Sequence, residues 1–135
     1  MSLERSPQFH QVRRILKTVA PDFRILANPG LDQGFSALDL LKKTIEISES
    51  EEEAKQAIPS LLFQIGHAIW HRHNGVNVKL TTEELASQNA SIDQFAFDWA
   101  TKALVMYFCF ELDDARKRMT QLVWSHEDWV FYFSK

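Results

Sequence analysis

Three of the five histidines lie within seven residues of one predicted helix, at a spacing that suits metal binding. They are His67, His71 and His73. On an α-helix His67 and His71 stand one turn apart, so both imidazoles can reach one metal ion. Zinc peptidases use this spacing but place a glutamate directly after the first histidine, where it activates the metal-bound water. Ala68 follows His67 here, so the pair can chelate a metal but has no adjacent base.

The same spacing also fits a helix surface that carries no chemistry. His67 and His71 lie roughly opposite the apolar stripe that the helix would bury, and the face opposite a core is usually solvated. Histidines near a helix C-terminus also interact favourably with the helix dipole. A metal site and a solvated helix face are therefore both open at the level of the sequence.

Three other groups of reactive residues favour structural roles. The segment His126-Glu127-Asp128-Trp129-Val130 begins like the zinc motif, but valine replaces its second histidine, so it is better interpreted as a helix start. Asp113-Asp114 is typical of a solvated helix terminus, because nothing in the neighbouring sequence would tune either carboxyl for acid-base work. Cys109 is the only cysteine and lies in an apolar run, which predicts a buried packing residue.

Length and composition indicate one domain over residues 1–135, with enough hydrophobic residues (45%) to form a core without disulfides or a structural metal. Fifteen Lys and Arg and eighteen Asp and Glu are scattered along the chain, without the basic block that nucleic-acid binding requires. The N-terminus lacks a signal-peptide pattern, and the longest apolar stretch is far shorter than the ~20 residues that cross a bilayer. We expect a cytoplasmic protein with no nucleic-acid partner and no membrane span.

Hydrophobic periodicity predicts helices and strands in one chain. Helices are expected at residues 7–19, from about 51 to 73, at 92–111 and through 119–123, and strands at 22–28, 34–38 and 43–48. Pro59 falls inside the second helix and predicts either a kink or a new helix start. Ser91 is expected to cap the long apolar helix, separately from an earlier helix signal at 81–84. Phe95, Trp99 and Met106 in that helix are spaced for burial.

Four segments follow one another in an order that is similar to a known family. They are Gly34-Phe35-Ser36-Ala37, Lys43-Thr44-Ile45-Glu46-Ile47, the helix with Leu61-Leu62-Phe63-Gln64-Ile65-Gly66-His67, and Asp93-Gln94-Phe95-Ala96-Phe97-Asp98-Trp99-Ala100. Together they resemble the ImmA/IrrE-type metallopeptidases, in which an edge strand precedes a helix bearing His-Glu-Leu-Gly-His and a later helix reads roughly Glu-x-x-Ala-x-x-Phe-Ala. The similarity covers about residues 34–104. It implies a zincin-like α+β fold, with a small three-stranded sheet packed against a central helix and several further helices.

The resemblance assigns a family role to four positions of this chain. Phe63 stands where the family has its first zinc histidine, and Gln64 where it has the catalytic glutamate. His67 matches the second zinc histidine, and Asp93 matches the third ligand, a glutamate in the family. Phenylalanine cannot ligate zinc, and glutamine has no basic oxygen that could take a proton from water. Peptidase activity by the family mechanism is therefore not expected.

Three functional hypotheses follow. The first is a non-catalytic metallopeptidase-like domain, without a cofactor, whose old cleft is filled by Phe63 and Trp70 and which binds another protein. Active family members act on helix-turn-helix repressors, so the resemblance suggests a regulator of that kind as the partner. The second is an active zinc metallohydrolase with a displaced site made of His67, His71 and Asp93, for which Glu84 is the only local base. The third is an unrelated α-rich interaction module whose aromatic segment at 124–133 docks on a partner or a second copy.

Overall fold

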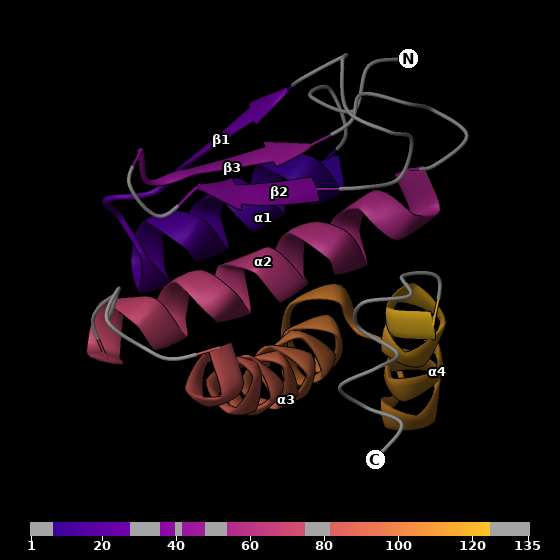
Figure 1. The fold of residues 1–135 in the computed structure, drawn as a ribbon. Coiled ribbons are helices and arrows are strands. Elements are labelled where there is room, and N and C mark those ends of the chain that lie inside the picture. Colours follow the sequence, from indigo (N-terminus) through magenta and orange to yellow (C-terminus); the bar gives the residue numbers. More distant parts are fainter. Residues whose placement is uncertain (1–6, 28–35, 40–41, 48–53, 75–81, 125–135) are drawn as a thin grey trace.

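The computed structural model describes residues 7–27, 36–39, 42–47, 54–74 and 82–124. Within these residues the chain forms four α-helices and a three-stranded sheet (Figure 1). The helices are α1 (Pro7–Val19), α2 (Ala54–Asn74), α3 (Thr82–Phe108) and α4 (Leu112–Trp124), and the strands are β1 (Arg24–Ala27), β2 (Ser36–Asp39) and β3 (Thr44–Ile47). The predicted α+β class is confirmed, as are the first helix and, within a few residues, the three strands. Apart from Trp124, the last residue of α4, the aromatic segment lies outside the described residues, as does the His126-Glu127 pair.

The sheet has the strand order β1-β3-β2, so β3 is its centre. β1 pairs with β3 in parallel, and β2 pairs with β3 in the antiparallel direction. Ile25 lies opposite Ile45 in this register, and both side chains are buried. The apolar residues of the alternating pattern that predicted β3, Ile45 and Ile47, therefore lie on the side of the sheet that faces the helices.

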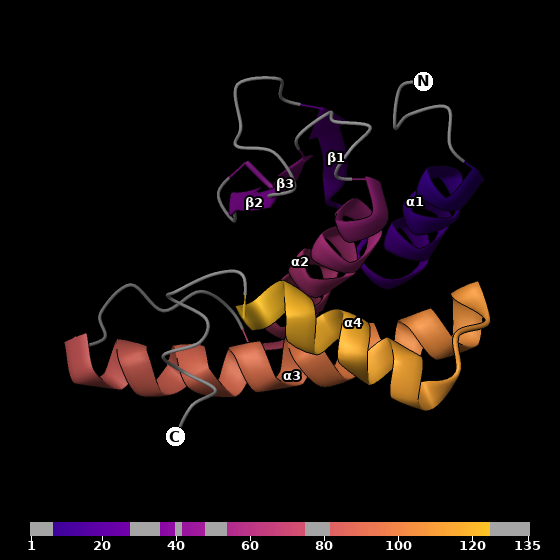
Figure 2. The same cartoon turned by 90° about the vertical axis from the view of Figure 1, so that its right-hand side faces the viewer.

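Helix α2 lies between two layers, which Figures 1 and 2 show from perpendicular directions. The sheet and α1 lie on one side of α2, and α3 and α4 lie on the other. Residues 57–66 of α2 are consequently all buried. A solvated face, one of the two alternatives for this helix, is therefore wrong for residues 57–66, because neighbouring elements cover both sides; near the C-terminal end of the helix His73 is exposed.

Pro59 lies within α2, and the helix continues through it from Ala54 to Asn74. A new helix start at Pro59 is therefore wrong. Pro59 is itself buried among the residues that anchor α2 to its neighbours, which indicates that tertiary packing outweighs the cost of about 3 kcal/mol that proline imposes inside a helix.

Helix α3 differs most from the expectation. It runs without interruption over 27 residues, so Ser91 lies inside it and does not cap a separate helix. No proline or glycine occurs between Thr82 and Phe108, and nothing in the backbone chemistry forces a break. Phe95 is 38% exposed and Met106 is 71% exposed, which corrects their predicted burial. The reason is that α3 lies at the edge of the molecule and buries mainly the side that faces α2 and α4 (Figure 2).

Cys109 follows α3 directly and is exposed, so its predicted burial is wrong. Its φ angle of 58° lies in the left-handed region, which ends the helix, and the backbone N–H of Phe110 donates to the carbonyl of Leu104 at 3.1 Å. The apolar run in the sequence therefore spans a helix end, where the side chain turns away from the core. No helix in the described part of the chain is both long and apolar enough to cross a membrane.

Asp22, which follows α1, joins three elements near the C-terminal end of α2. Its carboxylate accepts contacts from Arg72 Nε at 2.6 Å and from Lys43 Nζ at 3.2 Å. Arg72 also donates to the carbonyl of Val19. Desolvation raises the pKa of Asp22, but its own backbone N–H, Lys43 and Arg72 outweigh that effect and hold the pKa below its usual value. This cluster ties α1, the β2–β3 connection and α2 together.

We expect Asp22→Asn to lower the free energy of unfolding at pH 7 by less than about 1 kcal/mol, because the partners are partly exposed. The folded pKa lies below the unfolded value of about 3.9, so the contribution is fully present above that value and is lost as the pH falls through the folded pKa. Urea denaturation of both proteins at a series of pH values measures this difference, with Glu111→Gln as an exposed control. A difference that persists or grows in acid would contradict the assignment.

Helices α2 and α3 lie close together at Gly66. A Cβ atom on Gly66 would lie 2.7 Å from the Cα of Ala96 and 3.0 Å from its Cβ. Because the nearest atom belongs to the backbone of α3, it cannot rotate away. Glycine and alanine at these two positions therefore allow the two helix backbones to approach closely.

Gly66→Ala is expected to lower the free energy of unfolding by about 1–3 kcal/mol, since the added methyl group forces α2 and α3 apart. Helix propensity alone predicts the opposite, a gain of about 1 kcal/mol. Urea denaturation distinguishes the two effects by sign. His73→Ala, at an exposed position near the end of the same helix, is the control. A Gly66→Ala variant as stable as the wild type would show that the helices are not in close contact.

Candidate functional site

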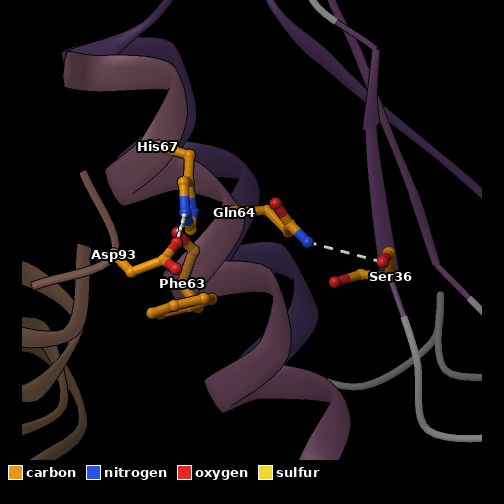
Figure 3. A network of polar contacts seen from close by, with 5 residues as sticks. All are labelled: Ser36, Phe63, Gln64, His67 and Asp93. Carbon is orange, nitrogen blue, oxygen red and sulfur yellow. Dashed lines mark hydrogen bonds and ion pairs between the residues drawn. The ribbon is translucent and has the colours of Figure 1, made fainter. Parts of the chain in front are cut away.

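The candidate site lies where α2 faces α3. His67 on α2 places its Nε2 atom 2.6 Å from Oδ1 of Asp93 on α3 (Figure 3). The other ring nitrogen, Nδ1, lies 2.9 Å from the carbonyl oxygen of Phe63, one turn earlier in α2. The two side chains are 14% and 8% exposed, so the pair is largely removed from water. The structure thus brings together two of the three residues predicted as metal ligands.

The hydrogen bonds of His67 define the protons of this pair. A carbonyl oxygen only accepts hydrogen bonds, so the Nδ1 atom of His67 must carry a hydrogen and donate it to Phe63. The Nε2 atom then either donates a second hydrogen to the Asp93 carboxylate or accepts one from a protonated carboxyl group. The first arrangement is an imidazolium beside a carboxylate, and the second is a neutral imidazole beside a protonated carboxyl group. Each holds one proton more than a neutral imidazole beside a carboxylate would hold. The pair is electrically neutral as a unit, which suits its burial.

Phe63 fills the space beside this pair. Its side chain is fully buried, and its ring meets the imidazole of His67 edge to face, with the ring centroids 4.6 Å apart and an angle of 81° between the planes. The ring of Phe63 therefore occupies one side of His67, while Asp93 occupies the end of the imidazole (Figure 3).

Gln64 points away from the histidine and toward the sheet (Figure 3). Its side-chain nitrogen donates to the carbonyl oxygen of Ser36 on β2 at 3.4 Å. The hydroxyl groups of Ser36 and Ser60 lie 2.6 Å apart, which adds a second link between α2 and the same strand. Because β2 is at the edge of the described sheet, these contacts fix the edge strand to the helix that carries His67.

His71 lies one turn beyond His67 and is half-buried, with its ring edge to face with that of Trp70 at a centroid distance of 5.2 Å. No group of three or more His, Cys, Asp or Glu side chains within the described residues is arranged to hold a metal ion. The side chain of Glu84 lies outside the part of the chain whose side chains are described. The structure therefore joins His67 to Asp93 and does not gather His71 into the same group.

The donor geometry can be compared with what zinc requires. Zinc binds histidine nitrogen and carboxylate oxygen at about 2.0–2.2 Å, so two ligands of a tetrahedral site lie about 3.3–3.6 Å apart. The Nε2 atom of His67 and Oδ1 of Asp93 are 2.6 Å apart, the separation of a direct hydrogen bond. Phe63 supplies no lone pair. The arrangement fits a proton between His67 and Asp93, and these two atoms would have to move apart to hold a zinc ion.

Sequence reasoning missed the contribution of Ser36 and Ser60. Ser60 is fully buried between apolar residues of α2, and a polar residue in such a run needs a hydrogen-bond partner. The position of Ser60 in an apolar run could therefore have indicated a buried hydrogen bond, but the sequence does not identify the partner. Asp98 and Asp113, by contrast, are exposed on helix surfaces, where water can satisfy their carboxylates.

A separate cavity of about 120 Å³ lies between the first turns of α1 and α2 and the end of α3. Ile58, Pro59, Leu104, Phe108 and Phe110 form its apolar walls, with Gln8 and Arg118 as polar lining residues. The cavity lining includes none of Phe63, Gln64, His67 and Asp93. The cavity is therefore not a substrate cleft for the His67 and Asp93 pair.

Comparisons with protein-family models, with curated proteins and with solved structures found no match for this chain.

A double-mutant cycle tests the pairing directly. His67→Ala and Asp93→Ala are each expected to lower the free energy of unfolding by about 3 kcal/mol, because each leaves the other partner buried without its hydrogen bond. The double variant should be more stable than the sum of the two losses predicts, by at least about 1 kcal/mol. Urea denaturation at one pH gives all four values. Strictly additive losses would show that the two residues do not interact.

Proposed function

We propose that this protein is a non-catalytic, zincin-like domain related to the ImmA/IrrE-type metallopeptidases, and that it acts by binding another protein. One observation carries this proposal. The positions that the resemblance assigns to zinc ligands, Phe63, His67 and Asp93, come from two helices and meet at one place. A zinc site requires such convergence, because its ligands must surround a single point.

The neighbouring contacts agree with this interpretation. Gln64, at the position of the catalytic glutamate, lies beside the edge strand β2, to which it donates a hydrogen bond. The resemblance expects an edge strand before the helix with the zinc motif, and β2 is antiparallel to its neighbour at the edge of the described sheet. A chance match of spacing along the sequence would not require these contacts in space. They support a retained scaffold.

The chemistry of the same residues argues against catalysis at this site. Phe63 has no atom that binds zinc, and both nitrogens of His67 are engaged in hydrogen bonds. Gln64 lacks a basic oxygen, and its amide is directed at Ser36. Neither a metal-bound water nor a base to activate it is supplied by these groups. The scaffold is therefore proposed to serve recognition.

A protein partner is proposed because the domain exposes large apolar side chains, which are typical of recognition surfaces. Tyr107 is 40% exposed and Leu112 is 46% exposed, on either side of the turn between α3 and α4. The resemblance suggests a helix-turn-helix regulator as this partner, because such regulators are the targets of active family members.

Restoring the missing groups tests the scaffold. The double variant Phe63→His, Gln64→Glu should bind about one zinc ion per chain, because it returns the first ligand and the base to positions beside His67 and Asp93. The wild type, purified without chelator, should contain far less than one equivalent. Metal analysis by mass spectrometry measures both, and circular dichroism verifies that the variants are folded.

Adding His67→Ala to the double variant provides the control, since it should abolish the restored binding. A folded double variant that binds no zinc would contradict the zincin-like scaffold. Near-stoichiometric zinc in the wild type that disappears in His67→Ala would instead contradict the non-catalytic assignment. The two parts of the proposal can therefore fail separately.

A further inference from the structure

Helix α3 carries a narrow exposed stripe formed by Phe95, Asp98, Lys102 and Met106. At about 100° per residue, these four positions fall within an arc of about 80° on the helix surface. Phe95 and Met106 are 38% and 71% exposed, and both charged residues are also exposed. Apolar residues thus stand at the two ends of the stripe and opposite charges stand between them.

The stripe lies on a part of the molecule that the described elements leave open. The small residues Ala96, Ala100 and Ala103 of α3 are buried on another side of the helix. Figures 1 and 2 show α3 along the edge of the molecule, with α2 above it and α4 beside it. A second helix could therefore lie along the exposed side of α3 without displacing α2 or α4.

The order of residues along the stripe is self-complementary. A two-fold axis that crosses α3 at the level of Ala100 would exchange Phe95 with Met106 and Asp98 with Lys102. Two copies of α3 packed in antiparallel orientation would consequently place each Phe95 near Met106 of the other copy and each Asp98 near Lys102 of the other copy. A parallel arrangement would instead place like charges opposite each other, which is unfavourable. The charge pattern thus selects one orientation.

The charges are available for this purpose. Lys102 makes no hydrogen bond or ion pair with any residue that the structure describes, and its side chain is exposed. Asp98 accepts a hydrogen bond from Gln94 at 3.2 Å through one carboxylate oxygen, Oδ1. Methionine and aromatic residues are enriched in protein interfaces, and charged pairs beside them set the partner and its orientation.

We infer that the chain forms a two-fold symmetric dimer through antiparallel contact of α3 with α3 of a second copy. Such an interface uses the same patch on both subunits, as a two-fold axis requires. It contains two Phe95 and Met106 contacts and two Asp98 and Lys102 ion pairs. The inference concerns the outer side of α3 and is independent of the function proposed for the buried site.

A charge-reversal experiment tests the orientation as well as the assembly. Light scattering at about 100 µM, above the Kd of a micromolar complex, should give the wild type about twice the mass of one chain. Asp98→Lys and Lys102→Asp should each shift the protein to the mass of one chain, because each places like charges opposite one another twice in the dimer. Circular dichroism should show that both variants keep the fold, since both positions are exposed.

Mixing the two single variants should restore the dimer mass, because the two lysines of the Asp98→Lys chain then face the two aspartates of the Lys102→Asp chain. The double variant Asp98→Lys, Lys102→Asp should also be dimeric by itself. Glu111→Lys, an exposed charge reversal beyond the stripe, should leave the mass unchanged. A monomeric wild type would overturn the inference. A dimer that both single reversals leave intact, or single variants that stay monomeric when mixed, would overturn it equally.

Discussion

The close approach of α2 and α3 at Gly66 is the constraint on which the rest of the structure depends. Without a side chain at this position the backbone of α3 can reach the surface of α2 at Ala96. His67 follows Gly66 in α2, and Asp93 precedes Ala96 by about one turn in α3, so the same approach brings the imidazole and the carboxylate into contact. A wider separation of the helices would leave His67 and Asp93 each buried without the other. The polar site is thus a consequence of one small residue in the helix interface.

Polar contacts cross α2 from one neighbouring layer to the other. On the sheet side Gln64 and Ser60 bind Ser36 of β2, and on the opposite side His67 binds Asp93 of α3. An apolar helix surface can slide or rotate with little change in contact area, whereas each of these hydrogen bonds is satisfied in one register only. We infer that the polar groups set the rotation of α2 between its two layers, while the surrounding apolar residues supply most of the stabilisation.

The local elements could be predicted from the sequence, because their signals are local. Apolar spacing from Pro7 to Val19 and alternation in Thr44–Ile47 identified α1 and β3. The surroundings of α2 and α3 could not be predicted in the same way. A helix covered on both sides has no solvated face to detect, and the apolar spacing of α3 does not show that Phe95 and Met106 lie at an edge of the molecule. At the site, the residue types of His67 and Asp93 indicated metal ligands. The sequence does not specify the distance between their side chains, and it is this distance that shows a hydrogen bond between them.

The hydrogen bond between His67 and Asp93 explains how a zinc site could be lost without loss of the fold under the proposed relationship. A zinc ion would accept the lone pair of a histidine nitrogen and neutralise the carboxylate beside it. When Phe63 replaces a ligand, the cation is no longer held, and a neutral imidazole nitrogen would face the carboxylate of Asp93 with no charge between them. A single proton resolves this conflict, because it lets His67 and Asp93 approach to 2.6 Å and makes the pair neutral. The ring of Phe63 occupies the space beside the imidazole. Under the proposed relationship, the proton would take over the charge of the metal, and the aromatic ring would take over the volume of its missing ligand.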